Sequence, residues 1–383
     1  MPPGASAVFV PGHSQGSMVD RRLLKNFDSA LVLVTACIIA FGCTMIYGAS
    51  STASAGYVER QLMWAFFGLI GAVVAASVDH TVYNRHGGRL YAISLAMLIA
   101  VQIFGRSSKG AQRWIAFGPI NVQPSEFAKI MLIIALAVFL AHRQPTIRTL
   151  KTFLLSFAYM AVPMALIFKQ PDLGTTLVLL AIWLTMVFVM GTHMKNIILF
   201  VGAVAVVGVV AWNVPGVMKD YQKKRIITFI NPGADPRGAG YHVTQSRIAI
   251  GSGQVLGKGY LKGTQRELRF IPEQHTDFIF TVVGEEMGFV GAVGLLGLYF
   301  GLIWRGLAIL ASAEDATGRA IAAGIVGMFL FHVLVNVGMT VGIMPVTGVP
   351  LPMFSYGGSS LMANLIAIGL LEGISMRRHR ISF

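Results

Sequence analysis

The sequence predicts an all-α integral membrane protein with about ten transmembrane helices and a large extracytoplasmic loop between helices 7 and 8. Of its 383 residues, 55% are hydrophobic and only 12% are charged, and the mean hydropathy is +0.69. Uninterrupted apolar runs of about 18–25 residues recur along the chain, long enough to cross a bilayer as helices. Lys and Arg gather in alternate connecting segments, as they do in chains that cross a membrane repeatedly.

The expected spans follow one another with short connections in the first half of the chain. They are centred at residues 29–49, 61–78, 89–105, 124–141, 152–168, 173–191, 196–213, 277–303, 319–343 and 357–375. Residues 1–26, rich in Gly, Pro and Ser, predict a disordered cytoplasmic tail, 27–376 the membrane domain, and 377–383 a cytoplasmic C-terminal tail. The distribution of basic residues between the connecting segments places both termini on the cytoplasmic side.

The extracytoplasmic loop, residues 214–276, carries ten Lys or Arg against four acids. Long loops escape the charge rule for membrane topology, so this excess can be without meaning. The alternative is an anionic partner at the outer leaflet, either lipid headgroups or a phosphate-bearing substrate. An amphipathic piece at 241–250 and Gly-rich turns at 251–263 indicate a structured loop, which usually has a function.

Asp277 lies where this loop ends and the next apolar run begins. An ionisable group at the mouth of a membrane helix is costly and marks a candidate functional site. The simpler interpretation is that the carboxylate only caps the helix by accepting hydrogen bonds from its first N–H groups.

Two further polar pairs open spans. Glu126 and Lys129 are three residues apart, so they share a helix face and can pair; they either neutralise each other or form a polar wall of an outward-facing cavity. Asp172 falls in the first turn of the sixth span, where the helix dipole favours a carboxylate. Lys169 beside it either flanks an ordinary helix start or meets a phosphate.

Four more polar residues lie inside apolar runs. His332 and Asn336 are four residues apart on one face, and the simpler interpretation is that each hydrogen-bonds a neighbouring helix. Glu285 lies eight residues after Asp277, close to the same face. At least one of Glu285 and Glu286 is expected to face the interior and to anchor a loop or a neighbouring helix.

The stretch 342–360 cannot form a continuous helix, because Pro345, Pro350 and Pro352 remove backbone donors. Irregular backbone at membrane depth survives only when it is buried in protein or lines a cavity. This stretch is therefore expected to re-enter the bundle and to line a pocket.

Several motifs between roughly residues 110 and 360 occur together in one order. They are Gln123–Glu126, Asn231-Pro232, Asp235-Pro236, Gly257–Gly259, Gly263–Gln265, Pro272–Phe280 and Pro345–Ser360. In these motifs the sequence resembles the SEDS family, the shape, elongation, division and sporulation proteins. The Asn-Pro pair and Pro-Glu-Gln-His-Thr-Asp favour its elongation members, of the RodA type, over its division members.

The resemblance implies a peptidoglycan glycosyltransferase, an enzyme that polymerises lipid II into β-1,4 glycan strands with inversion at the outer face of the cytoplasmic membrane. It also implies a class B penicillin-binding protein and other elongation-complex proteins as partners. Neither a nucleotide, an organic cofactor nor a nucleic acid is implied.

The family's essential aspartate falls on Asp277, the expected general base, and its Glu and Lys of the fourth span fall on Glu126 and Lys129. The expected substrate-binding residues are Lys169, Asp172, Lys258, His275, Ser355 and Ser359. A divalent cation, Mg²⁺ or Mn²⁺, is compatible with the chemistry, with Asp277 or Glu126 as a ligand.

Two other functions fit the same composition. A lipid II flippase also has buried charge among many helices, but it usually carries paired broken helices in inverted repeats, which the sequence lacks. A non-catalytic scaffold for the penicillin-binding protein would leave Asp277 dispensable.

Overall fold

A computed structural model describes most of the chain. The described residues are 26–50, 56–108, 111–118, 120–214, 218, 220–235, 238–264 and 274–377. The expected tail at 1–26 therefore lies, except for Asn26, outside the described residues, as does most of the tail at 377–383.

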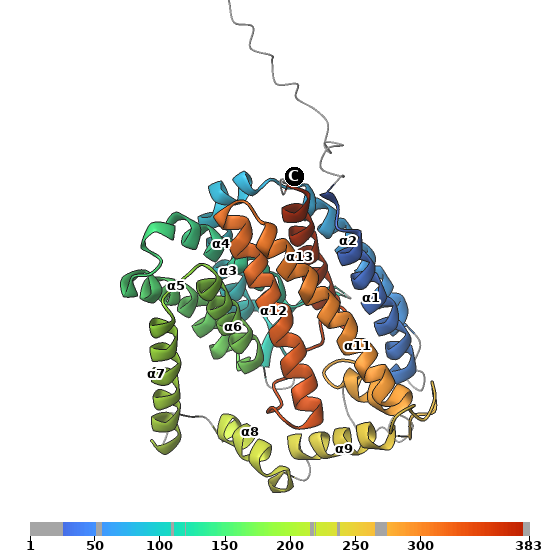
Figure 1. Ribbon diagram of the computed structural model, residues 1–383. Coiled ribbons are helices and arrows are strands. Elements are labelled where there is room, and N and C mark those ends of the chain that lie inside the picture. The colour runs from blue at the N-terminus through green and yellow to red at the C-terminus, as the bar shows by residue number, and fades with distance from the viewer. Residues whose placement is uncertain are drawn as a thin grey trace, which may run out of the picture.

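Helices make up almost all of the described structure (Figure 1). They are α1 (Ser29–Ser50), α2 (Tyr57–Ser77), α3 (His80–Phe104), α4 (Pro124–His142), α5 (Leu150–Lys169), α6 (Leu173–Val189), α7 (Met194–Asn213), α8 (Asp220–Ile230), α9 (Ala239–Ser252), α11 (Ile279–Ser312), α12 (Ala316–Val341) and α13 (Gly358–Met376). In this part of the chain nine helices are long and apolar enough to cross a membrane, and α6 is a shorter apolar helix. The prediction of an all-α, multi-pass membrane protein with about ten spans is confirmed.

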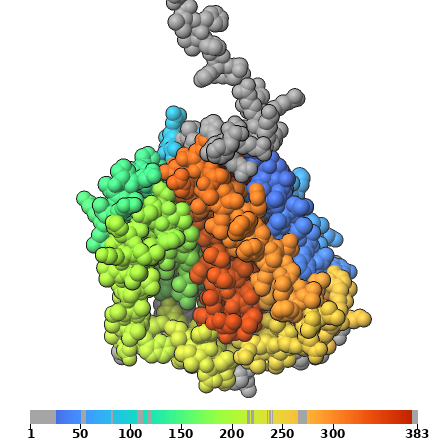
Figure 2. Space-filling model, viewed as in Figure 1, coloured from blue at the N-terminus to red at the C-terminus, as the bar shows by residue number. Residues whose placement is uncertain are grey.

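Both ends of the described chain lie at one end of the bundle, which we call the terminal face (Figure 1). Helices α8 and α9 lie across the opposite end, the loop face, and cover it in the space-filling view (Figure 2). The shared position of the two ends agrees with an even number of spans. The amphipathic piece expected at 241–250 is the helix α9.

The core lies between α4, α6, α11, α12 and α13, whose buried side chains form one apolar cluster. Helices α2 and α13 approach so closely that a Cβ at Gly369 would collide with the backbone of Ala72. Helix α7 is the exception, because none of its residues is buried among the described residues. It contacts the bundle through Phe200, whose ring lies 4.8 Å from that of Trp183.

A small antiparallel sheet connects α3 to α4 and was not predicted. Its strands are β1 (Arg106–Ser108), β2 (Ala111–Phe117) and β3 (Ile120–Val122), in the order β1-β2-β3. Because α4 begins directly after β3, the sheet lies at the loop face.

The segment after α12 is irregular, as predicted. Gly342 ends α12 in the left-handed conformation, with φ 85°, and the residues from there to Gly357 form no helix. Leu351, Phe354 and Ser355 are buried, and Met344–Val346 line a pocket with residues of α8 and α9. We call residues 343–357 the re-entrant segment; the prediction that this stretch re-enters the bundle and lines a pocket is confirmed.

Candidate active site

Asp277 lies in the turn at 274–278 that leads into α11. The N-cap of α11 is Phe278, so Asp277 stands one residue before the cap position. The Asp277 side chain is half-buried. A Cβ placed on Gly348 would lie 3.3 Å from Asp277 Oδ2, so the re-entrant segment passes against this carboxylate.

Asn336 holds the two sides of this contact together. Its Nδ2 donates to the carbonyl oxygen of Asp277 at 2.9 Å and to that of Val349 at 2.7 Å. Asn336 is fully buried, and its bond to Val349 is buried as well, so this bond is shielded from water and costly to lose. The expectation that Asn336 bonds a neighbouring element is confirmed, and that element carries Asp277.

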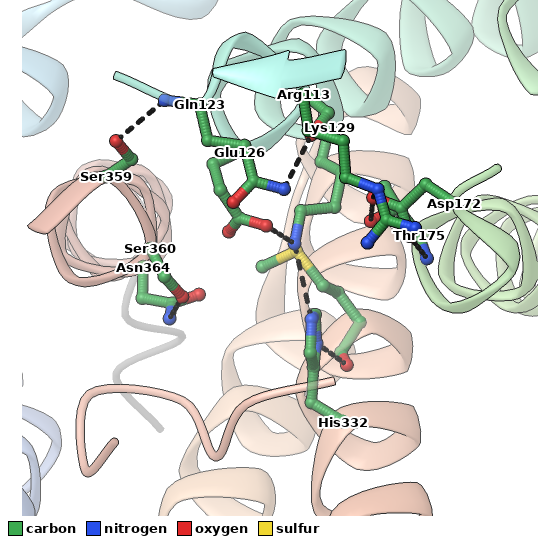
Figure 3. A network of polar contacts seen from close by, with 12 residues as sticks. Arg113, Gln123, Glu126, Lys129, Asp172, Thr175, His332, Ser359, Ser360 and Asn364 are labelled. Atoms are coloured by element: carbon green, nitrogen blue, oxygen red, sulfur yellow. Dashed lines mark hydrogen bonds and ion pairs between the residues drawn. The ribbon is translucent and has the colours of Figure 1, made fainter. Parts of the chain in front are cut away.

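Glu126 and Lys129 form the predicted pair, with Lys129 Nζ 2.9 Å from Glu126 Oε1. A third residue completes it: His332 Nε2 lies 3.3 Å from Lys129 Nζ, as Figure 3 shows. The three side chains are 4%, 2% and 3% exposed. The pair is therefore enclosed between α4 and α12 and does not form the wall of an open cavity in this structure.

Two residues of α12 contact the Glu126–Lys129 pair and the backbone of Asp277, respectively. His332 and Asn336 are four residues apart, so they lie one above the other on the same face, about 6 Å apart along the helix. One contacts Lys129 and the other contacts the backbone of Asp277. The structure thus brings the three residues predicted as catalytic to one face of α12, although they come from positions 126, 129 and 277.

Asp172 is the N-cap of α6 and so lies just before the helix, not within its first turn as expected. Its Oδ1 accepts from the backbone N–H of Thr175 at 3.1 Å, and its Oδ2 accepts from the Thr175 hydroxyl at 3.0 Å. Arg113 of β2 lies 3.7 Å from Oδ2 and also bonds the carbonyl of Pro171 (Figure 3). Lys169, at the end of α5, is exposed.

Lys258 forms an ion pair with Glu285. Its Nζ lies 2.8 Å from Glu285 Oε1 and donates to the hydroxyl of Thr264 at 2.7 Å. Glu286 Oε2 accepts from the backbone N–H of Leu261 at 3.2 Å, and both glutamates are 1% exposed. The expectation that at least one of them faces the interior and anchors a loop is confirmed for both.

The remaining expected substrate-binding residues surround the re-entrant segment. The ring of His275 lies 4.8 Å from that of Tyr57 and 5.6 Å from that of Tyr356. Ser355 Oγ accepts from the N–H of Leu351 at 2.9 Å, and Ser359 Oγ accepts from the N–H of Gln123 at 3.0 Å (Figure 3). Ser355 thus stabilises the re-entrant segment itself, and Ser359 links the start of α13 to the residue before α4.

A family profile described as a cell cycle protein, FTSW_RODA_SPOVE, matches residues 28–380. The chain belongs to this family. It is 40% identical to the peptidoglycan glycosyltransferase MrdB of Escherichia coli K12 across 93% of this chain and 95% of the relative. It is 36% identical to the peptidoglycan glycosyltransferase RodA of Treponema pallidum, across 93% of this chain and 99% of the relative.

Solved structures of FtsW/RodA/SpoVE proteins have the same fold. A chain solved in a study of the structural coordination of polymerization and crosslinking by a peptidoglycan synthase complex superposes with a TM-score of 0.79 and 35% identity, covering 91% of this chain and 97% of that one. The rod shape determining protein RodA of Thermus thermophilus gives a TM-score of 0.70 and 31% identity, covering 92% of this chain and 98% of that one.

The donor set of this family member does not build a cation site at Glu126. Its Oε1 is taken by the Lys129 ammonium at 2.9 Å, which would repel a second cation. Among the described residues, no three or more His, Cys, Asp or Glu side chains converge as metal ligands.

Two residues of the site had not been singled out in the sequence of this FtsW/RodA/SpoVE chain. Gln61 of α2 is 1% exposed; it donates to the carbonyl of Ser355 at 3.1 Å and accepts from the N–H of Gly357 at 3.3 Å. Arg113 fixes the turn before α6. Gln61 could have been found as a lone Gln in an apolar run. Arg113 carried no sequence signal beyond its charge.

Proposed function

We propose that this chain is a peptidoglycan glycosyltransferase that polymerises lipid II into β-1,4 glycan strands with inversion, for cell elongation and rod shape. The names of its relatives in E. coli and T. pallidum support the enzyme class. The observation that carries the proposal is the placement of Asp277, a half-buried carboxylate at the loop face. Asn336 of α12 bonds its backbone, and His332, one turn earlier on α12, contacts the Glu126–Lys129 pair of α4.

In this mechanism Asp277 is the general base. It takes the proton from the 4-hydroxyl of the acceptor sugar while that oxygen attacks the anomeric carbon of the donor. The bond from this carbon to the diphosphate breaks, and the diphosphate leaves with the electron pair. A single displacement from the opposite face turns the α linkage into a β linkage.

The leaving diphosphate requires positive charge nearby. Lys169 is the best candidate among the expected substrate contacts, because it is exposed at the end of α5, whereas Lys258 is held by Glu285. Lys129 and Glu126 are buried, and in this mechanism they influence the environment of Asp277, the general base.

We place the terminal face in the cytoplasm and the loop face outside the bacterial cytoplasmic membrane, where lipid II is used. Class B penicillin-binding proteins, which crosslink the product, and other elongation-complex proteins are the proposed partners. The similarity to a chain from a peptidoglycan synthase complex supports such an assembly.

The test uses the purified protein with its penicillin-binding partner and labelled lipid II, with glycan strands resolved on a gel. The wild type should give a ladder and Asp277→Asn should give none. Asp315→Asn is the matched control, because Asp315 caps α12 at the terminal face and asparagine caps equally well.

Each alternative function has its own outcome. No ladder from the wild type, with lipid II moved between leaflets of a vesicle, would indicate a flippase. No ladder and no transport, with the partner still bound, would indicate a scaffold. A ladder from both the wild type and Asp277→Asn would remove Asp277 as the base.

A further inference from the structure

The protonation of His332 follows from its two contacts. Its Nδ1 lies 2.7 Å from the carbonyl oxygen of Met328. A carbonyl can only accept, so Nδ1 carries the proton and the neutral ring offers a lone pair at Nε2. This nitrogen lies 3.3 Å from Lys129 Nζ, so Lys129 donates to His332.

The contact between Lys129 and His332 matters because the Glu126–Lys129 ion pair is buried. Glu126 and Lys129 are almost completely buried, and Glu126 Oε2 has no hydrogen-bond partner among the described residues. A buried ion pair is stable only when its geometry is good and its other donors are satisfied. His332 supplies the second acceptor for the ammonium and fixes the direction in which it points.

The same helix reaches Asp277 one turn further on. Asn336 donates hydrogen bonds to the backbone carbonyls of Asp277 and Val349. A shift of α12 against α4 would therefore move the carboxylate of Asp277 and the re-entrant segment together. Misplacement of a reacting group by about 1 Å can cost a hundredfold in rate.

We propose that His332 is a positioning residue of this site: by accepting from Lys129 it sets the contact between α4 and α12 in which Asn336 holds Asp277 in place. The inference rests on the proposed function. His332 touches neither substrate nor the reacting atoms, and its effect runs through Lys129 and α12.

Two substitutions separate this role from mere packing. In His332→Gln, the amide oxygen can occupy the place of Nε2 and accept from Lys129. His332→Phe keeps the ring but removes the acceptor. Phe329→Leu is the matched control for a disturbed core, since Phe329 is 1% exposed on the same helix.

The experiment measures glycan polymerisation by the complex with its penicillin-binding partner, as a function of labelled lipid II concentration. We expect kcat of His332→Phe to fall between about tenfold and a hundredfold with KM within about threefold. His332→Gln and Phe329→Leu should both stay within about threefold of the wild-type kcat. Thermal unfolding in detergent establishes that each variant is folded.

Three results would overturn the inference: a wild-type kcat in His332→Phe, equal losses in the Gln and Phe variants, or a change confined to KM. If the Phe variant does not fold, His332→Asn replaces it, because its shorter amide cannot reach Lys129. A wild type that makes no ladder would remove the proposed function, and this inference with it.

Discussion

Asn336 and Asp277 are joined by a part-buried hydrogen bond of 2.9 Å, from the side-chain amide of Asn336 to the backbone carbonyl of Asp277. The donor of this bond lies on α12, and its acceptor lies in the turn that leads into α11. A side chain near the end of α12 thus fixes the backbone of the acid that precedes α11.

Asn336→Leu should weaken both the fold and the activity. The carbonyl of Val349 would lose its donor in a buried position, at roughly 1–3 kcal/mol, and the carbonyl of Asp277 would lose its donor in a part-buried one. We expect a lower unfolding temperature and a reduced rate of glycan synthesis. Asn364→Leu is the control, because Asn364 is also buried but donates to the hydroxyl of Ser360 within its own helix; equal losses in the two variants would contradict a special role for Asn336.

Lys258→Met should loosen the connection between α9 and α11. Glu285, 1% exposed, would keep its charge without the ammonium at 2.8 Å, at a cost of roughly 2–3 kcal/mol. Adding Glu285→Gln removes that charge and should restore most of the stability, measured by thermal unfolding and by trypsin digestion of the connection.

The same double variant tests the expected substrate-binding role of Lys258. An anchoring role predicts that polymerisation returns together with stability. If stability returns and the glycan ladder does not, Lys258 contacts the substrate.

Asp172→Ala should lower stability by about 1 kcal/mol through loss of the N-cap of α6. Asp172→Asn should retain most of that stability, because asparagine caps as well as aspartate. Unfolding temperatures of the two variants check this. Polymerisation lost in the Asn variant despite normal stability would instead assign the carboxylate charge to substrate binding.

Acid should loosen α9 through His242. Burial lowers the pKa of His242 below its ordinary 6.5, although Asp235 opposes this. A buried histidine with a lowered pKa binds its proton more readily in the opened state, so stability is present above about pH 6.5 and is lost as the pH falls below it.

Protease sensitivity of α9 between pH 5 and 8 measures this effect, with the pH range set around the ordinary histidine pKa of about 6.5. The wild type should become more sensitive at the acid end, and His242→Phe should lose that dependence. His193→Ala, at an exposed histidine, should behave as the wild type. An unchanged profile in His242→Phe would exclude His242 as the titrating group.

The spans could be predicted because hydropathy over about 20 residues is a local property of the chain. The residues at which the spans begin and end were harder to predict. Helix α3 begins at His80 rather than near 89, since its first turns are polar, and α11 runs to Ser312 through a non-helical residue, Gly288. The small sheet was missed because strands of three to seven residues carry little periodic signal.

Within the site, the Glu126–Lys129 pair followed from spacing alone, because its partners are three residues apart on one helix. The third member could not be found in this way: His332 lies 203 residues away from Lys129 along the chain. The same holds for Asn336 and Asp277. Such contacts depend on which helix faces meet, and that is decided by packing between spans.

Helix α7 has a consequence for the response of the protein to its lipid environment. Its 20 residues cover about 30 Å, and no residue of it is buried among the described residues. A helix in this situation can respond to a change in bilayer thickness by tilting, and a tilt of α7 would act on the contact between Phe200 and Trp183. Lys223 of α8 lies 5.9 Å from the Trp212 ring of α7, so a tilt of α7 would also change this contact at the loop face.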